Sequence, residues 1–298
     1  IQPGCHKTQT KKAKKHSMAT LEAIIDEIDQ LKPVSDIAGK VMSLLDDPDC
    51  GLSDLVDIIR FEPALTTNVL KLANSAYFGL PGKIDDAKQA IIYLGMTQVV
   101  ELVLLACCSE PFKGSHEGYE MAKGNLWENA VSGAIMANHL AQIKGIKQSS
   151  LTFSGALLRD IGKVIMDPYV DSAKDKILGR LKAKDLTFLD AERQVLGYDH
   201  TQIGALIAKK WNFPSALQCV LRYYHIPLEA KGCFIEASIV YLADAMCRKM
   251  EIGLGLDDAY YVEDERVAKS LGFTEIQTQG VIDDFGQKME RVKALFES

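Results

Sequence analysis

The sequence has no long apolar run, no recognisable secretion signal and no excess of positive charge, and each absence excludes a class of protein. The longest apolar run, VVELVLLACC at 99–108, is too short to span about 30 Å of hydrocarbon, and it contains Glu101. No apolar core followed by a small-residue cleavage site is visible near the N-terminus, so we expect no signal peptide. The net charge of −6 disfavours a dedicated nucleic-acid binder, because phosphate contacts require a basic surface. We expect neither membrane nor nucleic acid as a partner.

Cysteines are also few, and they form neither a CxxC pair nor a regular framework. An odd number of cysteines scattered through apolar helical stretches is typical of reduced, mostly buried thiols. This pattern predicts a soluble protein of the cytoplasm. The seven positions are Cys5, Cys50, Cys107, Cys108, Cys219, Cys233 and Cys247.

Sequence signatures of nucleotide chemistry are missing as well. There is no Walker loop, and the segment 253-GLGLDD-258 lacks the third glycine of a dinucleotide fingerprint and follows no strand. The adjacent Cys107 and Cys108 lie in an apolar stretch and are expected to be inert. We therefore expect no cofactor.

Helical periodicity dominates the chain. A content of 47% hydrophobic and 25% charged residues over 298 positions is ordinary for a globular protein with a sizeable core. Apolar residues recur with helical spacing at 52–59 and at 65–73, and Glu62-Pro63 separates the two runs because proline suits the first turn of a helix. Asp199 to Gln202 and Thr274 to Gln277 match the capping box of a helix N-terminus. No alternating strand is found, so the fold class is all-α.

The helices form two blocks between terminal segments. Residues 1–20 include five lysines and predict a basic disordered arm, with a binding arm as the alternative. A first helical block covers 21–110, and a polar, glycine-bearing segment at 109–125 precedes a second block at 126–250. The remaining residues, 251–298, predict a helical C-terminal extension with an acidic loop.

Two groups of motifs resemble the HD-related output domain family, HDOD. The most specific is 72-LANSAYFGLPGKI-84, which is long and contiguous. The segments 126-LWENAVSG-133, 155-GALLRDIGK-163, 197-GYDHTQIGALIAKKW-211 and 219-CVLRYYHIP-227 then follow in the order of the family. The resemblance covers roughly residues 25–245. It implies an all-helical fold of two blocks, the second similar to HD-superfamily phosphohydrolases, in a bacterial signalling protein without secure catalytic activity.

The same resemblance implies a metal site whose ligands have changed. HD enzymes hold a divalent metal with a His, a His-Asp pair and a distant Asp, and here Asn129 and Arg159 occupy the positions of the two histidines. An amide oxygen is a poor substitute for imidazole, so we expect Asn129 to hydrogen-bond a buried group rather than ligate metal. A guanidinium cannot ligate metal and would repel it. Arg159 either fills the vacated cation site or turns out to solvent.

The remaining positions of the family's site are present. Asp160 and Asp244 match the other primary ligands, and His200 and His225 match histidines that resemble secondary ligands. A buried carboxylate requires a partner, and Arg159 is the candidate for Asp244. Each of these residues could instead be purely structural, and with two primary ligands replaced we predict no metal. Arg222 lies one turn before His225, so Arg159 and Arg222 are the possible contacts for an anion.

The sequence therefore predicts a non-catalytic, cytoplasmic regulatory module that binds a partner protein or a small anionic ligand. The competing hypothesis is a metal-dependent phosphohydrolase or phosphodiesterase that uses an altered ligand set. A weaker hypothesis is nucleic-acid binding through the lysine arm.

The turn that contains Tyr77 and Phe78 is expected to lock the two blocks together, or else to dock another protein.

Overall fold

The computed structural model describes residues 21–30, 32–46, 52–146, 149–183 and 186–296. The predicted basic arm at 1–20 lies outside the described residues, and so do Cys5 and Cys50. Within the described residues there is no β-strand, only an isolated bridge between His116 and Met121. The all-α prediction is confirmed.

Fifteen helices are assigned in the described part of the chain, together with three short 3₁₀ turns. The first eight are α1 (Leu21–Gln30), α2 (Lys32–Asp46), α3 (Leu52–Arg60), α4 (Pro63–Ala73), α5 (Ala87–Leu94), α6 (Met96–Phe112), α7 (Asn125–Ile143) and α8 (Ser149–Leu158). The others are α9 (Ile161–Ala183), α10 (Phe188–Leu196), α11 (His200–Lys210), α12 (Ser215–Tyr223), α13 (Phe234–Lys249), α14 (Glu265–Ser270) and α15 (Glu275–Phe296). The turns are η1 (Glu117–Tyr119), η2 (Pro227–Glu229) and η3 (Leu256–Tyr260).

Local sequence signals set several helix starts. Pro63 is the first residue of α4, as the Glu62-Pro63 break predicts. Asp199 caps α11 by accepting from the backbone N–H of Gln202, and the glutamine side chain reaches back to complete the box. Thr274 and Gln277 make the same reciprocal bonds at the start of α15. The predicted break and both capping boxes are confirmed.

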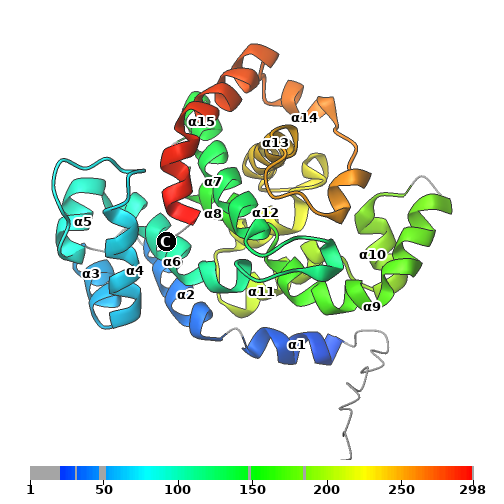
Figure 1. The fold of residues 1–298 in the computed structure, drawn as a ribbon, viewed down its shortest axis with the longest axis horizontal. Helices are drawn as coiled ribbons and strands as arrows, with labels where there is room; N and C mark the ends of the chain where they lie inside the picture. Colours follow the sequence, from blue (N-terminus) through cyan, green and yellow to red (C-terminus); the bar gives the residue numbers. More distant parts are fainter. Residues whose placement is uncertain (1–20, 31, 47–51, 147–148, 184–185, 297–298) are drawn as a thin grey trace, which may run out of the picture.

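Helix α6 lies at the centre of the molecule. It packs against α2, α4 and α5 on one side and against α7 and α8 on the other, and Figure 1 shows α3, α4 and α5 standing together beside it. Residues 99–105 of this helix are all buried, including Glu101. A helix that is buried all round is expected in the middle of a helical core rather than at its surface.

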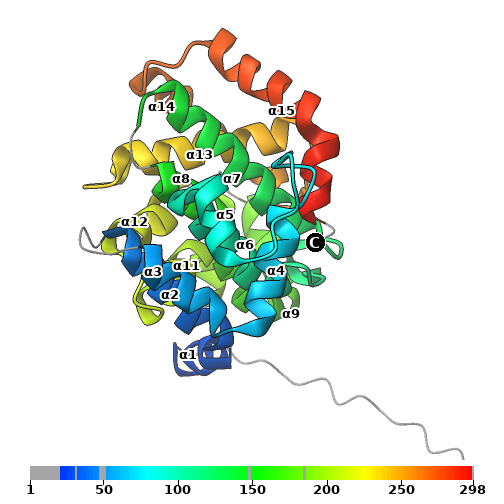
Figure 2. The ribbon, with the colours of Figure 1, turned by 90° about the vertical axis from the view of Figure 1, so that its left-hand side faces the viewer.

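The C-terminal extension packs onto the body of the protein. Helix α15 lies along α7 (Figure 1), and in the view of Figure 2 its end reaches the region of the turn after α4. Four apolar residues of α15 are buried, so the burial of an apolar face holds this helix in place. They are Val281, Phe285, Val292 and Leu295.

The cysteines differ from the prediction of free thiols. Cys219 of α12 and Cys233, just before α13, form a disulfide with their Cα atoms 6.1 Å apart. The bond closes the turn that carries η2, and the sequence spacing could not reveal this approach because it depends on how the turn folds. Cys107, Cys108 and Cys247 are free. The cysteine pattern therefore no longer supports a reducing compartment.

The start of α9 is held very close to the start of α11 by a glycine. A methyl group on Gly162 would overlap the carbonyl oxygen of His200, so only glycine fits this contact. The contact sets Asp160, two residues earlier, against the first turn of α11. Candidate site residues from two separate motifs are thereby brought together.

Candidate functional site

Arg159 lies at the centre of a buried cluster of charges. Its side chain is 0% exposed. Nε donates to Asp244 Oδ1 at 3.0 Å and lies 3.4 Å from Asp160 Oδ2, while Nη1 donates to the carbonyl of Ala156 at 2.6 Å. Nη2 donates to the side-chain oxygen of Asn129. The guanidinium joins α8, α7 and α13 and is directed away from solvent.

Asn129 is fixed by bonds on both sides of its amide. Its oxygen accepts from Arg159, and its nitrogen donates to the carbonyl of Ile252 at 2.8 Å. These bonds satisfy the buried amide. They also tie α7 to the segment after α13, which belongs to the predicted C-terminal extension.

The two aspartates that contact Arg159 each contact a second cation. Lys163, one turn after Asp160, lies 3.2 Å from it, and Arg248 bonds to Asp244 across one turn of α13. Burial alone would raise the pKa of the Asp160 carboxyl, but Lys163 and Arg159 outweigh it and hold this pKa well below its usual range. The pKa of Asp244 is likewise lowered, because Arg248 and Arg159 outweigh its burial. Both carboxylates are ionised at neutral pH.

Lys163 also reaches the segment after α13. Its ammonium donates to Asp257 at 2.8 Å and lies 5.5 Å from the ring centroid of Tyr119, which comes from η1. The Tyr119 hydroxyl donates to Glu192 at 2.5 Å. The segments before α7 and after α13 therefore close the cluster on two sides.

His200 connects this cluster to α10 and α12. Its Nδ1 donates to Glu192 at 2.8 Å, and Nε2 lies 3.1 Å from the Tyr224 hydroxyl, which donates to Asp160 at 2.8 Å. Burial would lower the pKa of His200, but the charge of Glu192 and its hydrogen bond outweigh burial and raise it. A continuous hydrogen-bonded chain thus runs from Glu192 through His200 and Tyr224 to Asp160.

His225 lies beside His200 in a different state. The two Nε2 atoms are 3.3 Å apart. Burial, and then the positive charge of His200, lower the pKa of His225 to about 3. The pair therefore consists of a histidine that favours the proton and a neutral neighbour that can accept a hydrogen bond from it.

A cavity of about 380 Å³ opens beside the two histidines. Asp257, Tyr260 and Tyr261 of the C-terminal segment line one side. Arg222 lies on the wall, with Nη1 donating to the Thr201 hydroxyl at 2.9 Å. Arg193 lines the cavity as well, but it is paired with Asp190 and Asp199.

The donor set does not fit a divalent cation. A hydrolytic metal requires about three ligands of the His, Asp or Glu type with a position left for water. Here the Arg159 guanidinium lies between the two aspartates, and His200 Nε2 is 4.0 Å from Asp160. Across the described ranges, no group of three or more His, Cys, Asp or Glu side chains is arranged to hold a metal ion.

The structure brings together the six residues of the predicted pocket: Asn129, Arg159, Asp160, His200, His225 and Asp244. Arg159 is fully buried, so of the two predicted anion contacts only Arg222 lines a cavity. Sequence reasoning missed Tyr119, Lys163, Glu192, Tyr224 and Asp257. Lys163 and Tyr224 had local signals, because Lys163 lies one turn after Asp160 and Tyr224 directly precedes His225.

The comparisons with known proteins agree with this architecture. A family model described as HDOD domain matches residues 31–227. A curated relative, an uncharacterized protein of Treponema pallidum (strain Nichols), is 26% identical over 213 residues. The match covers 68% of this chain, and the chain spans only 39% of the length of that relative.

Solved structures show the same fold. An HDOD domain protein of unknown function from Geobacter sulfurreducens has a TM-score of 0.68 at 22% identity, covering 95% of this chain and 93% of its own. A protein of Shewanella amazonensis SB2B, provisionally named a phosphohydrolase, has a TM-score of 0.69 at 20% identity, covering 94% and 99%. A protein of Marinobacter aquaeolei VT8, provisionally named a signal transduction protein, has a TM-score of 0.72 at 20% identity, covering 95% and 62%.

No described helix combines the length and apolar character needed to cross a membrane.

Proposed function

This chain belongs to the HDOD domain family, and we propose that it is a non-catalytic regulatory protein of bacterial signal transduction. In this proposal the second block keeps the shape of a phosphohydrolase and has lost its metal. It acts by presenting a surface, or the cavity beside His200, to a protein partner or a small anionic ligand. The relative provisionally named a signal transduction protein supports the class of function.

The observation that carries the proposal is the position of Arg159. Its guanidinium supplies the positive charge that a metal would otherwise supply to Asp160 and Asp244. Unlike a metal ion, a guanidinium cannot coordinate a water molecule and lower its pKa, so it cannot generate the hydroxide nucleophile of a metal-dependent phosphohydrolase. The buried aspartates remain neutralised without any chemistry.

An anion would bind at the mouth of the cavity rather than at Arg159. Arg222 is partly exposed there. Of its guanidinium nitrogens, only Nη1 makes a hydrogen bond with a described residue. His200, whose pKa is raised, adds positive character deeper in the cavity. Guanidinium groups favour carboxylates and phosphates because two parallel N–H groups match two oxygens.

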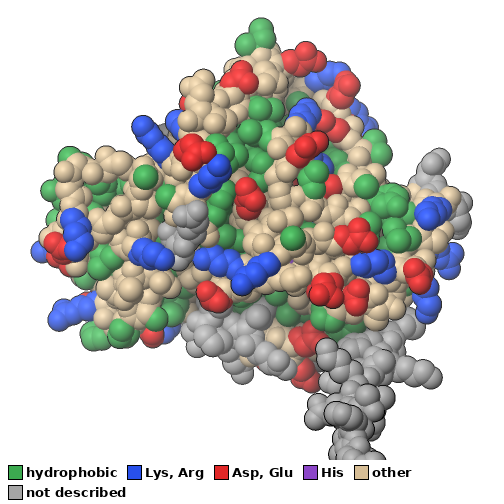
Figure 3. Space-filling view, in the orientation of Figure 1, with side chains coloured by type: hydrophobic (Ala, Val, Ile, Leu, Met, Phe, Trp, Pro, Cys, Tyr) green, Lys and Arg blue, Asp and Glu red, His purple; other side chains and the backbone are tan. Residues whose placement is uncertain are grey.

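Nucleic acid is a less favoured partner. On the face seen in Figure 3, Lys and Arg side chains are interspersed with Asp and Glu and do not gather into one basic surface. Recognition of a nucleic-acid backbone requires clustered positive charge.

The proposal is tested by metal content and turnover. Purified wild-type protein and Asp160→Ala, both incubated with Mn²⁺ and Zn²⁺ and then desalted, are expected to retain no stoichiometric metal by mass spectrometry. Neither should hydrolyse a generic phosphodiester such as bis-p-nitrophenyl phosphate. About one equivalent of metal in the wild type, lost in Asp160→Ala and accompanied by turnover, would overturn the proposal.

Anion binding is tested separately with inorganic pyrophosphate. We expect binding by calorimetry that weakens in Arg222→Gln and is unchanged in Arg180→Gln, which alters an exposed arginine of α9. Equal affinity in both variants would exclude the cavity as the anion site and leave a protein partner as the proposed input.

The alternative is a metal-dependent phosphohydrolase with an altered ligand set. It is favoured by the closeness of Asp160 and His225 to His200, and both histidines line the cavity. Two relatives provisionally named phosphohydrolases also support it. It requires Arg159 to swing out when metal binds, so it predicts the metal-dependent turnover described above.

A further inference from the structure

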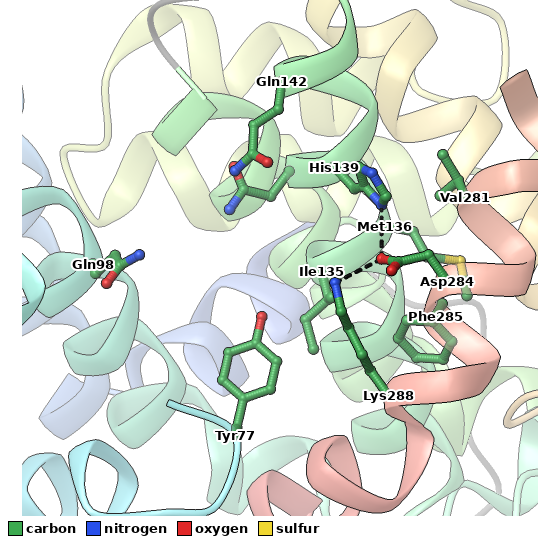
Figure 4. Close-up of a pocket in the computed structure, with 11 residues that line it drawn as sticks. Tyr77, Gln98, Ile135, Met136, His139, Gln142, Val281, Asp284, Phe285 and Lys288 are labelled. Carbon is green, nitrogen blue, oxygen red and sulfur yellow. Dashed lines mark hydrogen bonds and ion pairs between the residues drawn. The ribbon is translucent and has the colours of Figure 1, made fainter. Parts of the chain in front are cut away.

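A second cavity, lined by residues other than those around Arg159, lies where α6, α7 and α15 meet. Its outer part has a volume of about 240 Å³ and is lined by residues of α7, of α15 and of the turn after α4. Figure 4 shows the hydroxyl of Tyr77 directed into this space, with Asp284 bonded to His139 and Lys288 at one edge. An inner cavity of about 40 Å³ continues from it, since Tyr77 and Gln98 line both.

The inner cavity holds a buried acid without a protein partner. Glu101 is 8% exposed and makes no hydrogen bond or ion pair with any described residue. Asn138 lines the same cavity, and its side-chain oxygen is buried and likewise lacks a partner in the described part of the chain. Two buried polar side chains without a protein partner are costly in an apolar setting, so the native protein is expected to satisfy them with a bound group or with water.

The walls around these two polar side chains are apolar. Phe78, Leu102, Val131 and Ile135 are among the residues that enclose the inner cavity. A mostly apolar pocket with a few convergent polar groups is the usual form of a small-molecule site. The chemistry that fits is an apolar stem with a cationic donor at its inner end.

We propose that this cavity binds a small organic cation, a primary alkylamine whose ammonium group bonds to Glu101 and Asn138. The alkyl chain extends past Tyr77 toward the outer cavity. The site uses the family's Tyr77 motif on one side and α15, which lies beyond the matched family region, on the other. It is separate from the cluster around Arg159 and independent of the proposed function.

The site has a distinctive dependence on pH. Burial raises the pKa of Glu101 from its usual 4.5 to about 8, so the empty site holds a neutral acid at pH 7. An ammonium ion binds the ionised form, so binding releases the proton of Glu101. Below about pH 8 the affinity therefore rises about tenfold per pH unit. The other groups at the site are Tyr77 from the turn, His139 from α7, and Asp284 with Lys288 from α15.

The experiment is calorimetric titration with n-hexylamine, compared with 1-hexanol, at pH 6, 7 and 8. We expect one site that prefers the amine and becomes tighter with pH. Glu101→Gln should weaken amine binding at least about tenfold at pH 8 and abolish its pH dependence, because the amide keeps the shape and loses the charge. Glu110→Gln, an exposed position on the same helix, should bind like the wild type.

His139→Gln removes the histidine that lines the outer cavity and should keep the pH dependence, because that dependence comes from Glu101. Circular dichroism checks folding; if Glu101→Gln does not fold, the pH profiles of the wild type and His139→Gln decide. Equal affinity for amine and alcohol, a flat profile in the wild type, or no binding would each overturn the proposal. In the last case, buried water satisfies the two polar side chains.

Discussion

Replacing Arg159 with methionine tests how the buried charges are held. The side chain is 0% exposed and contacts two carboxylates, at 3.0 and 3.4 Å. Removing one partner of a buried ion pair costs about 3–5 kcal/mol, because the charge left behind is desolvated. Lys163 and Arg248 remain beside the aspartates, so we expect a loss at the lower end, about 3 kcal/mol at pH 7.

The loss should depend on pH with a defined sign. In the wild type, the pKa values of Asp160 and Asp244 are depressed, so their contribution to stability is present above their unfolded pKa, near 3.8. This contribution to stability is lost as pH falls through the pKa values that the two aspartates have in the folded protein. In Arg159→Met these folded pKa values rise, so the native variant takes up protons earlier as pH falls. The difference in stability between the two proteins is largest at pH 7 and narrows toward pH 3.

The assay is urea unfolding followed by far-UV circular dichroism at several pH values. The matched control is Arg266→Met, because the guanidinium of Arg266 contacts Asp264 at 78% exposure and solvent screens such surface pairs. If Arg159→Met were as stable as the control, or if its loss did not change with pH, Arg159 would not be the counter-charge of the aspartates. Arg159 would then not replace the metal in this pocket.

Three further predictions concern the elements that shape the site. Gly162→Ala should lower the free energy of unfolding by about 1–3 kcal/mol, because the added methyl group overlaps the carbonyl of His200. Gly179→Ala, on the same helix but with open space around it, should raise the free energy of unfolding by about 0.5–1 kcal/mol. Urea unfolding measures both. Cys219→Ser, which removes the disulfide, should lower the free energy of unfolding by about 3 kcal/mol in non-reducing buffer. Dithiothreitol should bring the wild type to the same urea midpoint as the variant. A midpoint of the wild type that does not change with reductant would contradict the disulfide. Tyr224→Phe should lose about 1–3 kcal/mol by urea unfolding, because it leaves buried partners unsatisfied, and an unchanged midpoint would contradict the hydrogen-bonded chain.

Local features were predictable from the sequence because their physics is local. The break at Glu62-Pro63 follows from the fixed backbone angle of proline, and the capping boxes at Asp199 and Thr274 follow from bonds within one turn. The absence of strands in the described residues follows from the missing period-two pattern. None of these inferences depends on which helices pack together.

The site was only partly predictable because its contacts span the chain. Arg159 meets Asp244 across 85 positions, and periodicity cannot place α8 against α13, so only the family resemblance suggested that pairing. Glu192 and Tyr119 lie 73 positions apart, and neither stands in a motif that indicates a partner. The disulfide was missed for the same reason: two cysteines in ordinary helical sequence meet only because the turn at η2 folds back.

The buried arginine also limits how such a protein can be regulated. A metal site changes state when metal binds or leaves, but Arg159 is covalently part of the chain and permanently charged, so it cannot dissociate from the pocket as a metal ion can. In the proposed function, a change in the pocket therefore comes from groups that reach its mouth. His200 is the connecting residue, because it borders the cavity and is linked through Tyr224 to Asp160. An anion that binds near Arg222 would favour the protonated form of His200, and the hydrogen-bonded chain would carry that preference to the charged core.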